Sequence, residues 1–78
     1  MRINYKKTPT VCNIEKYLFD RTKAELARFC GVTAQAVNWW SNGQSVPNSP
    51  MRSIIVDYLA EAVEGGLSEA DIWPMLKQ

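Results

Sequence analysis

The side chains best suited to recognition chemistry lie close together between residues 33 and 42. An amide offers a hydrogen-bond donor and an acceptor side by side, so Gln35 or Asn38 can pair bidentately with the edge of adenine. The Thr33 methyl group and Ala34 can pack on thymine methyl groups. This chemistry requires one exposed face of a helix that fits the major groove of double-stranded DNA.

The residue spacing predicts the two helices that would position this face. Thr22 and Glu25 form a capping box, which satisfies backbone donors at a helix start, so a helix should begin at Lys23. Gly31 can adopt a positive φ angle and end that helix, and Thr33 is a suitable N-cap for the next one. The inward positions of both helices hold small or apolar residues: Leu26, Ala27, Cys30, Val32, Val37 and Trp40. These spacings predict a helix-turn-helix.

The two helices and the loop after them carry a pattern of small, turn-forming and apolar residues. Its members are Ala27, Gly31, Val32, Thr33, Val37, Trp40, Asn42, Gly43 and Pro47. Over roughly residues 13–58 the chain resembles the lambda-repressor/Cro group of phage and prophage regulators, and agreement at many positions is more specific than a short motif. The resemblance implies an all-α fold, a compact bundle of four to five short helices with a helix-turn-helix, as in a lambda-repressor-like DNA-binding domain.

The resemblance also implies roles for individual residues. It aligns the family's base-contacting positions with Thr33, Ala34, Gln35 and Trp39, to which the amide of Asn38 adds a fifth candidate on the same face. It places the start of the second helix against the DNA backbone, which makes Lys23 either a phosphate contact or an ordinary solvated lysine. The predicted backbone contacts are Lys6, Lys7, Lys23, Arg28, Asn42, Gln44 and Ser45.

The predicted third helix departs from the family's pattern in two ways. No charged residue occurs between Phe29 and Met51, so this helix brings no arginine for guanine and little attraction for phosphate. Trp39, next to the inward Trp40, leaves a large aromatic surface near the presumed groove. Trp39 could stack on sugar or methyl groups, wedge against the DNA, contact another protein, or pack at the edge of its own core.

Charge is divided unevenly along the chain, although the formal net charge is only +1. Residues 1–56 hold eight Lys and Arg against three acidic residues, which is +5. Residues 57–78 hold one Lys against five acidic residues, which is −4. This asymmetry predicts an N-terminal part that faces phosphates and a C-terminal part that faces away from them.

The chain divides into an arm, a helical domain and a C-terminal segment. Residues 1–9 form a basic arm, and the sequence leaves open whether it is a solvated terminus, a segment that binds DNA, or a strand that pairs with a second subunit. The domain should span residues 10–66, with the helix-turn-helix at residues 23–42. Residues 67–78 form a short apolar and acidic segment.

Two further helices complete the predicted domain. The first should run from Thr10, a possible N-cap, to about Phe19, with Val11, Ile14 and Leu18 inward. The fourth should have Ser49 as N-cap and Pro50 in its first turn, and it should stop at Gly65–Gly66. Its apolar stripe consists of Met51, Ile54, Ile55, Tyr58, Leu59 and Ala62.

The C-terminal segment opens with a capping-box pair, Ser68 and Asp71, and Pro74 limits the helix that follows. It is rich in apolar residues for a tail: Leu67, Ile72, Trp73, Met75 and Leu76. We expect it to fold back on the domain, to form a dimer contact, or to do both.

The composition argues against several classes of protein. With no histidine, no glycine-rich phosphate loop and no nucleophile–base spacing, we expect neither an enzyme nor a small-molecule substrate, and no cofactor. Cys12 and Cys30 lack the spacing of a metal site and are expected to be buried free thiols rather than metal ligands or a disulfide. No segment has the roughly 18 apolar residues of a membrane span or the form of a signal peptide, so a cytoplasmic location is expected.

Two functions fit these patterns. The first is a sequence-specific transcriptional regulator, a Cro-type phage or prophage repressor that binds a near-palindromic DNA operator as a homodimer. The second keeps the fold but not the DNA: a protein-interaction module, such as an antitoxin-like partner or an enzyme inhibitor, that uses surfaces at Trp39 and Trp73.

Overall fold

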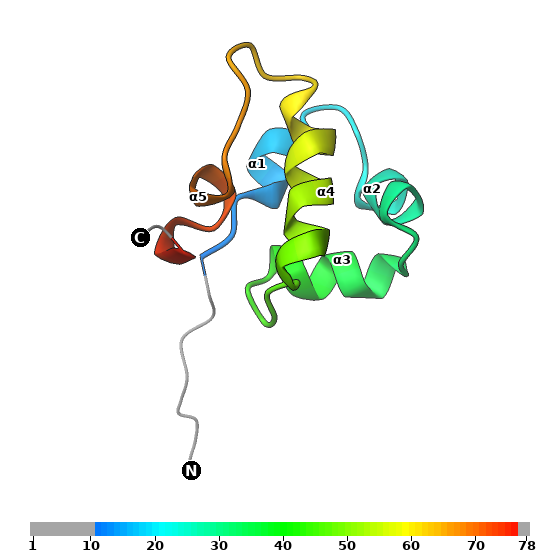
Figure 1. Cartoon of the computed structure of the whole chain (residues 1–78). Coiled ribbons are helices and arrows are strands. Elements are labelled where there is room, and N and C mark those ends of the chain that lie inside the picture. The colour runs from blue at the N-terminus through cyan, green and yellow to red at the C-terminus, as the bar shows by residue number, and fades with distance from the viewer. Residues whose placement is uncertain (1–10, 77–78) are drawn as a thin grey trace.

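The computed structural model describes residues 11–76, and it is all-α over that range. Its elements are α1 (Ile14–Leu18), α2 (Lys23–Cys30), α3 (Ala34–Ser41), α4 (Ser49–Ala60), α5 (Glu69–Ile72) and a 3₁₀ turn, η1 (Pro74–Leu76). In Figure 1, α4 runs through the centre, with α1 behind it, α2 and α3 to one side and below, and α5 on the other side. The predicted arm, with Lys6 and Lys7, and the predicted N-cap Thr10 lie outside the described residues.

The boundaries of α2 and α3 are set by local hydrogen bonds, as the sequence predicts. The Thr22 hydroxyl accepts from the Glu25 N–H at 3.1 Å, and the Glu25 carboxylate accepts from the Thr22 N–H at 2.9 Å. Gly31 ends α2 with a φ of 76°, and Thr33 caps α3 by accepting from the Ala36 N–H at 3.2 Å. Because both starts and the turn between them depend on short-range contacts, sequence is sufficient to place them.

One hydrophobic core receives residues from all five helices and from Trp73. Its ten buried members are Ile14, Leu18, Leu26, Ala27, Val37, Trp40, Ile55, Leu59, Ile72 and Trp73. Ile72 and Trp73 have no exposed surface, so α5 and the residue after it complete the core rather than project from it. A core this small depends on each of its contributors.

Arg21, in the link between α1 and α2, ties together the C-terminal ends of two helices. Its guanidinium donates to the backbone carbonyl oxygens of Tyr17 at 3.0 Å and of Leu18 at 3.2 Å, both at the end of α1. It also donates to the backbone carbonyl oxygen of Tyr58, near the end of α4, at 2.7 Å, and it lies 4.7 Å from the centre of the Tyr58 ring. Carbonyls at a helix end lack partners within the helix, so Arg21 satisfies three acceptors and joins α1 to α4.

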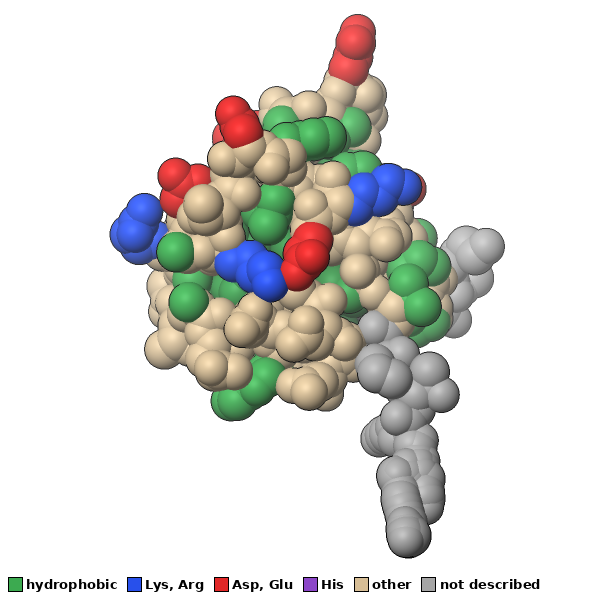
Figure 2. Space-filling view, turned by 180° about the vertical axis from the view of Figure 1, so that it is seen from behind, with side chains coloured by type: hydrophobic (Ala, Val, Ile, Leu, Met, Phe, Trp, Pro, Cys, Tyr) green, Lys and Arg blue, Asp and Glu red, His purple; other side chains and the backbone are tan. Residues whose placement is uncertain are grey.

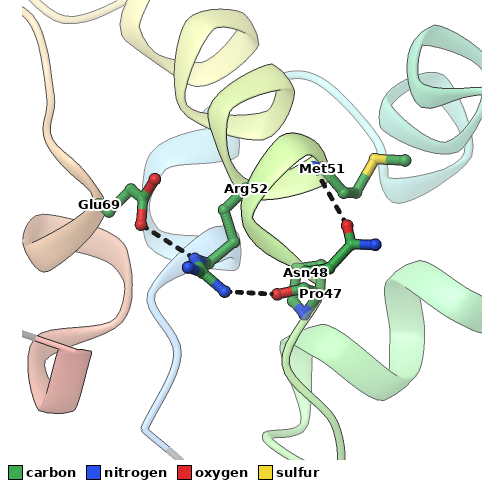
Figure 3. Close-up of polar contacts among 5 residues, drawn as sticks. All are labelled: Pro47, Asn48, Met51, Arg52 and Glu69. Carbon is green, nitrogen blue, oxygen red and sulfur yellow. Dashed lines mark hydrogen bonds and ion pairs between the residues drawn. The ribbon is translucent and has the colours of Figure 1, made fainter.

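Polar contacts hold α5 against the rest of the domain. The Asn13 backbone N–H donates to the backbone carbonyl oxygen of Ile72, and the Asn13 side chain donates to the backbone carbonyl oxygen of Asp71, each at 2.8 Å. Arg52 of α4 pairs with Glu69 at 2.9 Å and donates to the Pro47 oxygen at 2.8 Å (Figure 3). The C-terminal segment therefore folds back on α4 and on Asn13, the residue before α1.

The predicted start of the first helix is wrong. α1 begins at Ile14 rather than near Thr10, and Val11, expected to face inward, is 58% exposed. Asn13 occupies the N-cap position but makes no side-chain capping hydrogen bond, and its Nδ2 donates to the backbone carbonyl oxygen of Asp71. The start of α1 is thus adjoined by a contact across 58 residues, which a local sequence pattern cannot predict.

The predicted ends of the fourth helix also need correction. Its cap is Asn48 rather than Ser49, because the Asn48 side chain accepts from the Met51 N–H at 3.3 Å (Figure 3). The helix ends at Ala60, well before Gly65, and Ala62 is exposed after it. Ile54, expected inward, is 37% exposed.

Phe19 occupies a strained position in the turn after α1. The Arg21 N–H donates to the Leu18 oxygen at 3.0 Å, which closes a turn with Phe19 at its second position. Phe19 has φ 57° and ψ −117°, the conformation of a type II′ turn that strongly favours glycine there. Its side chain is 61% exposed and so regains little by packing.

Phe19→Gly should therefore raise the free energy of unfolding, by about 1 kcal/mol, because glycine adopts this conformation without strain. Urea denaturation followed by circular dichroism measures the change. Ala24→Gly, at an exposed position of α2, is the control and should destabilise, since its φ angle is helical. A less stable Phe19→Gly protein would contradict the strain.

Ile72→Ala should cost about 2–5 kcal/mol of unfolding free energy, because it removes a fully buried side chain from the core. The same urea titration measures it. Met75→Ala, only three residues later but 45% exposed, should change stability by less than about 0.5 kcal/mol. Equal effects of the two substitutions would show that the tail does not pack as described.

Candidate nucleic-acid interface

α3 presents five predicted base-reading residues on its solvent side. Thr33, Ala34, Gln35, Asn38 and Trp39 are all exposed. Val37 and Trp40 point into the core, and the two adjacent tryptophans differ accordingly, Trp39 being 48% exposed and Trp40 8%. Because Val37 and Trp40 are buried, the residues on the opposite side of α3 face solvent.

The C-terminal end of α3 is closed by backbone hydrogen bonds. The Gln44 N–H donates to the Trp39 oxygen at 2.9 Å and the Gly43 N–H to the Trp40 oxygen at 3.1 Å, a Schellman motif with Gly43 at a φ of 80°. The Asn42 N–H donates to the Asn38 oxygen at 2.9 Å. These backbone donors are occupied, so Asn42 and Gln44 can reach a phosphate only through their side chains.

Lys23 is held between two other helices. Its Nζ lies 2.7 Å from Glu15 Oε2 of α1 and 2.9 Å from Asn38 Oδ1 of α3. The Lys23 side chain is one-third exposed. The charge predicted to meet a phosphate is thus paired inside the molecule, and it contacts one of the predicted base-reading side chains.

The other predicted backbone contacts within residues 11–76 are all solvent-exposed. Arg28, in the last turn of α2, is exposed, as are Asn42, Gln44 and Ser45 after α3. Arg28 makes no ion pair with any residue between 11 and 76. Its charge is therefore not neutralised by a carboxylate of that part of the chain.

Charged side chains are distributed unevenly over the molecule. Figure 2 shows both acidic and basic side chains over the upper and middle parts of the molecule, whereas its lower part, where α3 lies in Figure 1, carries uncharged polar and hydrophobic side chains. This matches the sequence, in which α3 and the loop after it have no charged residue. The reading face is thus polar but neutral.

Cys12 and Cys30 are free and partly buried. Burial raises the pKa of both thiols, and at Cys12 the Ile14 backbone and the Trp73 indole only partly offset it. Within residues 11–76 no group of three His, Cys, Asp or Glu side chains could hold a metal ion, and no helix there is long and apolar enough to cross a membrane.

Comparison with known proteins found no matching family model, no matching curated protein and no matching solved structure. The resemblance to the lambda-repressor/Cro group therefore stays a prediction from the residues of this chain.

Sequence reasoning missed two features of this region. The Glu15–Lys23–Asn38 contact joins residues of three helices, and no motif in the sequence signals it. Trp73, offered as part of a protein-binding surface, has no exposed area, so that expectation is wrong. The apolar residues next to Trp73 in the sequence are compatible with either a buried or an exposed Trp73. The packing of α5 on the domain buries it.

The raised thiol pKa values predict slow alkylation by iodoacetamide at neutral pH in the folded protein and fast alkylation in urea, measured by mass spectrometry.

The raised thiol pKa values also contribute to the free energy of unfolding. Unfolded thiols ionise from about pH 9, before the folded ones, so the contribution is present below that pH and is lost as pH rises through the pKa values of the folded protein. The Cys12→Ala, Cys30→Ala double variant should lose less stability between pH 8 and about 10 than the parent protein. An identical pH dependence would contradict the raised values.

Proposed function

We propose that this protein is a sequence-specific double-stranded DNA-binding transcriptional regulator. The observation that carries the proposal is the exposed face of α3, which displays two amides, a hydroxyl, a methyl group and an indole. This helix is capped at both ends and has its opposite face in the core. A rigid helix that displays the Gln35 amide and the Asn38 NH₂ group without partners in residues 11–76 suits base readout in the major groove.

In this proposal α2 and α3 act as a helix-turn-helix of the Cro type. α3 enters the major groove, where Gln35 and Asn38 contact base edges while Thr33 and Ala34 contact methyl groups. A homodimer would set two copies of α3 about 34 Å apart on a near-palindromic operator. Occupancy of the operator would exclude polymerase and repress transcription.

Because the reading face is neutral, attraction to phosphate must come from its surroundings. Arg28 beside α3 and the arm residues Lys6 and Lys7 are the proposed sources. Each phosphate that a cation neutralises steepens the dependence of binding on salt by about 0.9 in log–log slope. Lys23 adds to that slope only if it exchanges Glu15 for a phosphate.

A second candidate is supported by Trp39, half-exposed on a face without charge. Such a surface suits a protein partner, because aromatic residues are enriched and charges depleted at interface centres. In this alternative the chain is an interaction module, antitoxin-like or an enzyme inhibitor, whose contact is centred on Trp39 alone.

Selection of bound sequences from a random duplex library should enrich a near-palindromic site, and titration at two salt concentrations should show binding that weakens steeply with salt. The triple variant Lys23→Ala, Gln35→Ala, Asn38→Ala should lose the preference. As a control, Glu61→Ala with Glu64→Ala, beyond the far end of α4, should enrich the same site.

Enrichment of the same site by the triple variant would reject the assigned surface. If the parent protein enriches no sequence, the DNA proposal fails and the interaction module replaces it. Trp39→Ala would then be expected to abolish partner capture.

A further inference from the structure

The contact between Lys23 and Asn38 fixes which end of the Asn38 amide faces outward. Lys23 Nζ lies 2.9 Å from Asn38 Oδ1. An ammonium group has donors only, so the reverse amide orientation would set the donors of Nδ2 against it. The oxygen must therefore turn toward Lys23, and the NH₂ group points away from it.

Glu15 keeps the ammonium in this place. Its Oε2 lies 2.7 Å from the same Nζ, so one cation is bound by a carboxylate of α1 and an amide oxygen of α3. A charge-assisted hydrogen bond is shorter and stronger than a neutral one. Two such bonds from separate helices restrict the Lys23 side chain, and through it the Asn38 side chain.

The Asn38 NH₂ group remains available to a ligand. Asn38 is exposed, and its Nδ2 donates to no residue between 11 and 76. Gln35 differs, because its side chain makes no hydrogen bond within the same range and can turn either end toward a base.

We infer that Lys23 is a positioning residue that makes Asn38 a hydrogen-bond donor toward DNA, so that Asn38 selects guanine rather than adenine. Guanine presents two acceptors, O6 and N7, in the major groove, whereas adenine places the N6 donor beside N7. A bidentate pair with adenine needs Oδ1 and Nδ2 side by side against the base, and Lys23 holds Oδ1. The inference rests on the proposed function and revises the expectation that either amide reads adenine.

The test compares the parent protein with Lys23→Met by selection from a random duplex library. Asn38→Ala first identifies the position read by Asn38, as the one where base preference disappears. At that position the parent protein should favour guanine over adenine by about fivefold or more. Lys23→Met should lower or reverse that preference, because Oδ1 is then free to accept from adenine N6.

Lys16→Met is the matched control. It removes the same charge from an exposed lysine of α1 that makes no hydrogen bond with Asn38, and should keep the guanine preference. In the free protein, the side-chain NH₂ signals of Asn38 in a nitrogen–proton NMR spectrum should shift in Lys23→Met and not in Lys16→Met. This readout reports the contact without DNA and verifies that the variant is folded.

The outcomes separate this inference from the proposed function. Adenine preferred by the parent protein, the same preference in Lys23→Met, or unmoved Asn38 signals would each overturn the role of Lys23 while leaving a DNA-binding regulator. Equal weakening of every sequence by Asn38→Ala would place Asn38 on a phosphate and overturn it as well. Failure to enrich any sequence would overturn both.

Discussion

The burial of Val37 and Trp40 is the constraint on which the rest of the candidate site depends. Both side chains enter a core that also holds residues of α1, α2, α4 and α5, so α3 cannot rotate about its axis without exposing an indole. Rotation is thus opposed by the exposure of two buried apolar side chains to water rather than by the loss of one bond. Because side chains repeat every 3.6 residues, this choice also determines that Gln35, Asn38 and Trp39 face solvent.

Ion pairs within the protein reduce the positive charge that the sequence predicts around α3. The basic N-terminal half loses part of its charge to internal pairs: Lys23 binds Glu15, and Arg52 binds Glu69 of the acidic C-terminal segment. What remains near α3 is a neutral, polar face with Arg28 at its side. A ligand of that face must gain its specificity from hydrogen bonds and packing, and only its affinity from more distant charge.

Sequence was sufficient where structure is decided locally. The limits of α2, the turn at Gly31 and the start of α3 depend on caps within three or four residues, and all were predicted. It failed at α1, where the side chain of Asn13 serves the Asp71 carbonyl instead of its own helix, and at Asn48, where two adjacent residues both favour a cap. The pairing of Lys23 with Asn38 depends on how three helices pack, which no spacing along the chain encodes.

The Lys23 contact couples the candidate reading face to the packing of the domain. Glu15 belongs to α1, which is held by Arg21 to α4 and by Asn13 to α5. The placement of α1 thus decides where the Glu15 carboxylate lies, and so where Lys23 holds the amide of Asn38. In the proposed function, residues far from α3, such as those that dock the C-terminal segment, would therefore influence how Asn38 meets a base. In so small a core, the contacts that stabilise the domain would then also position the side chain proposed to recognise DNA.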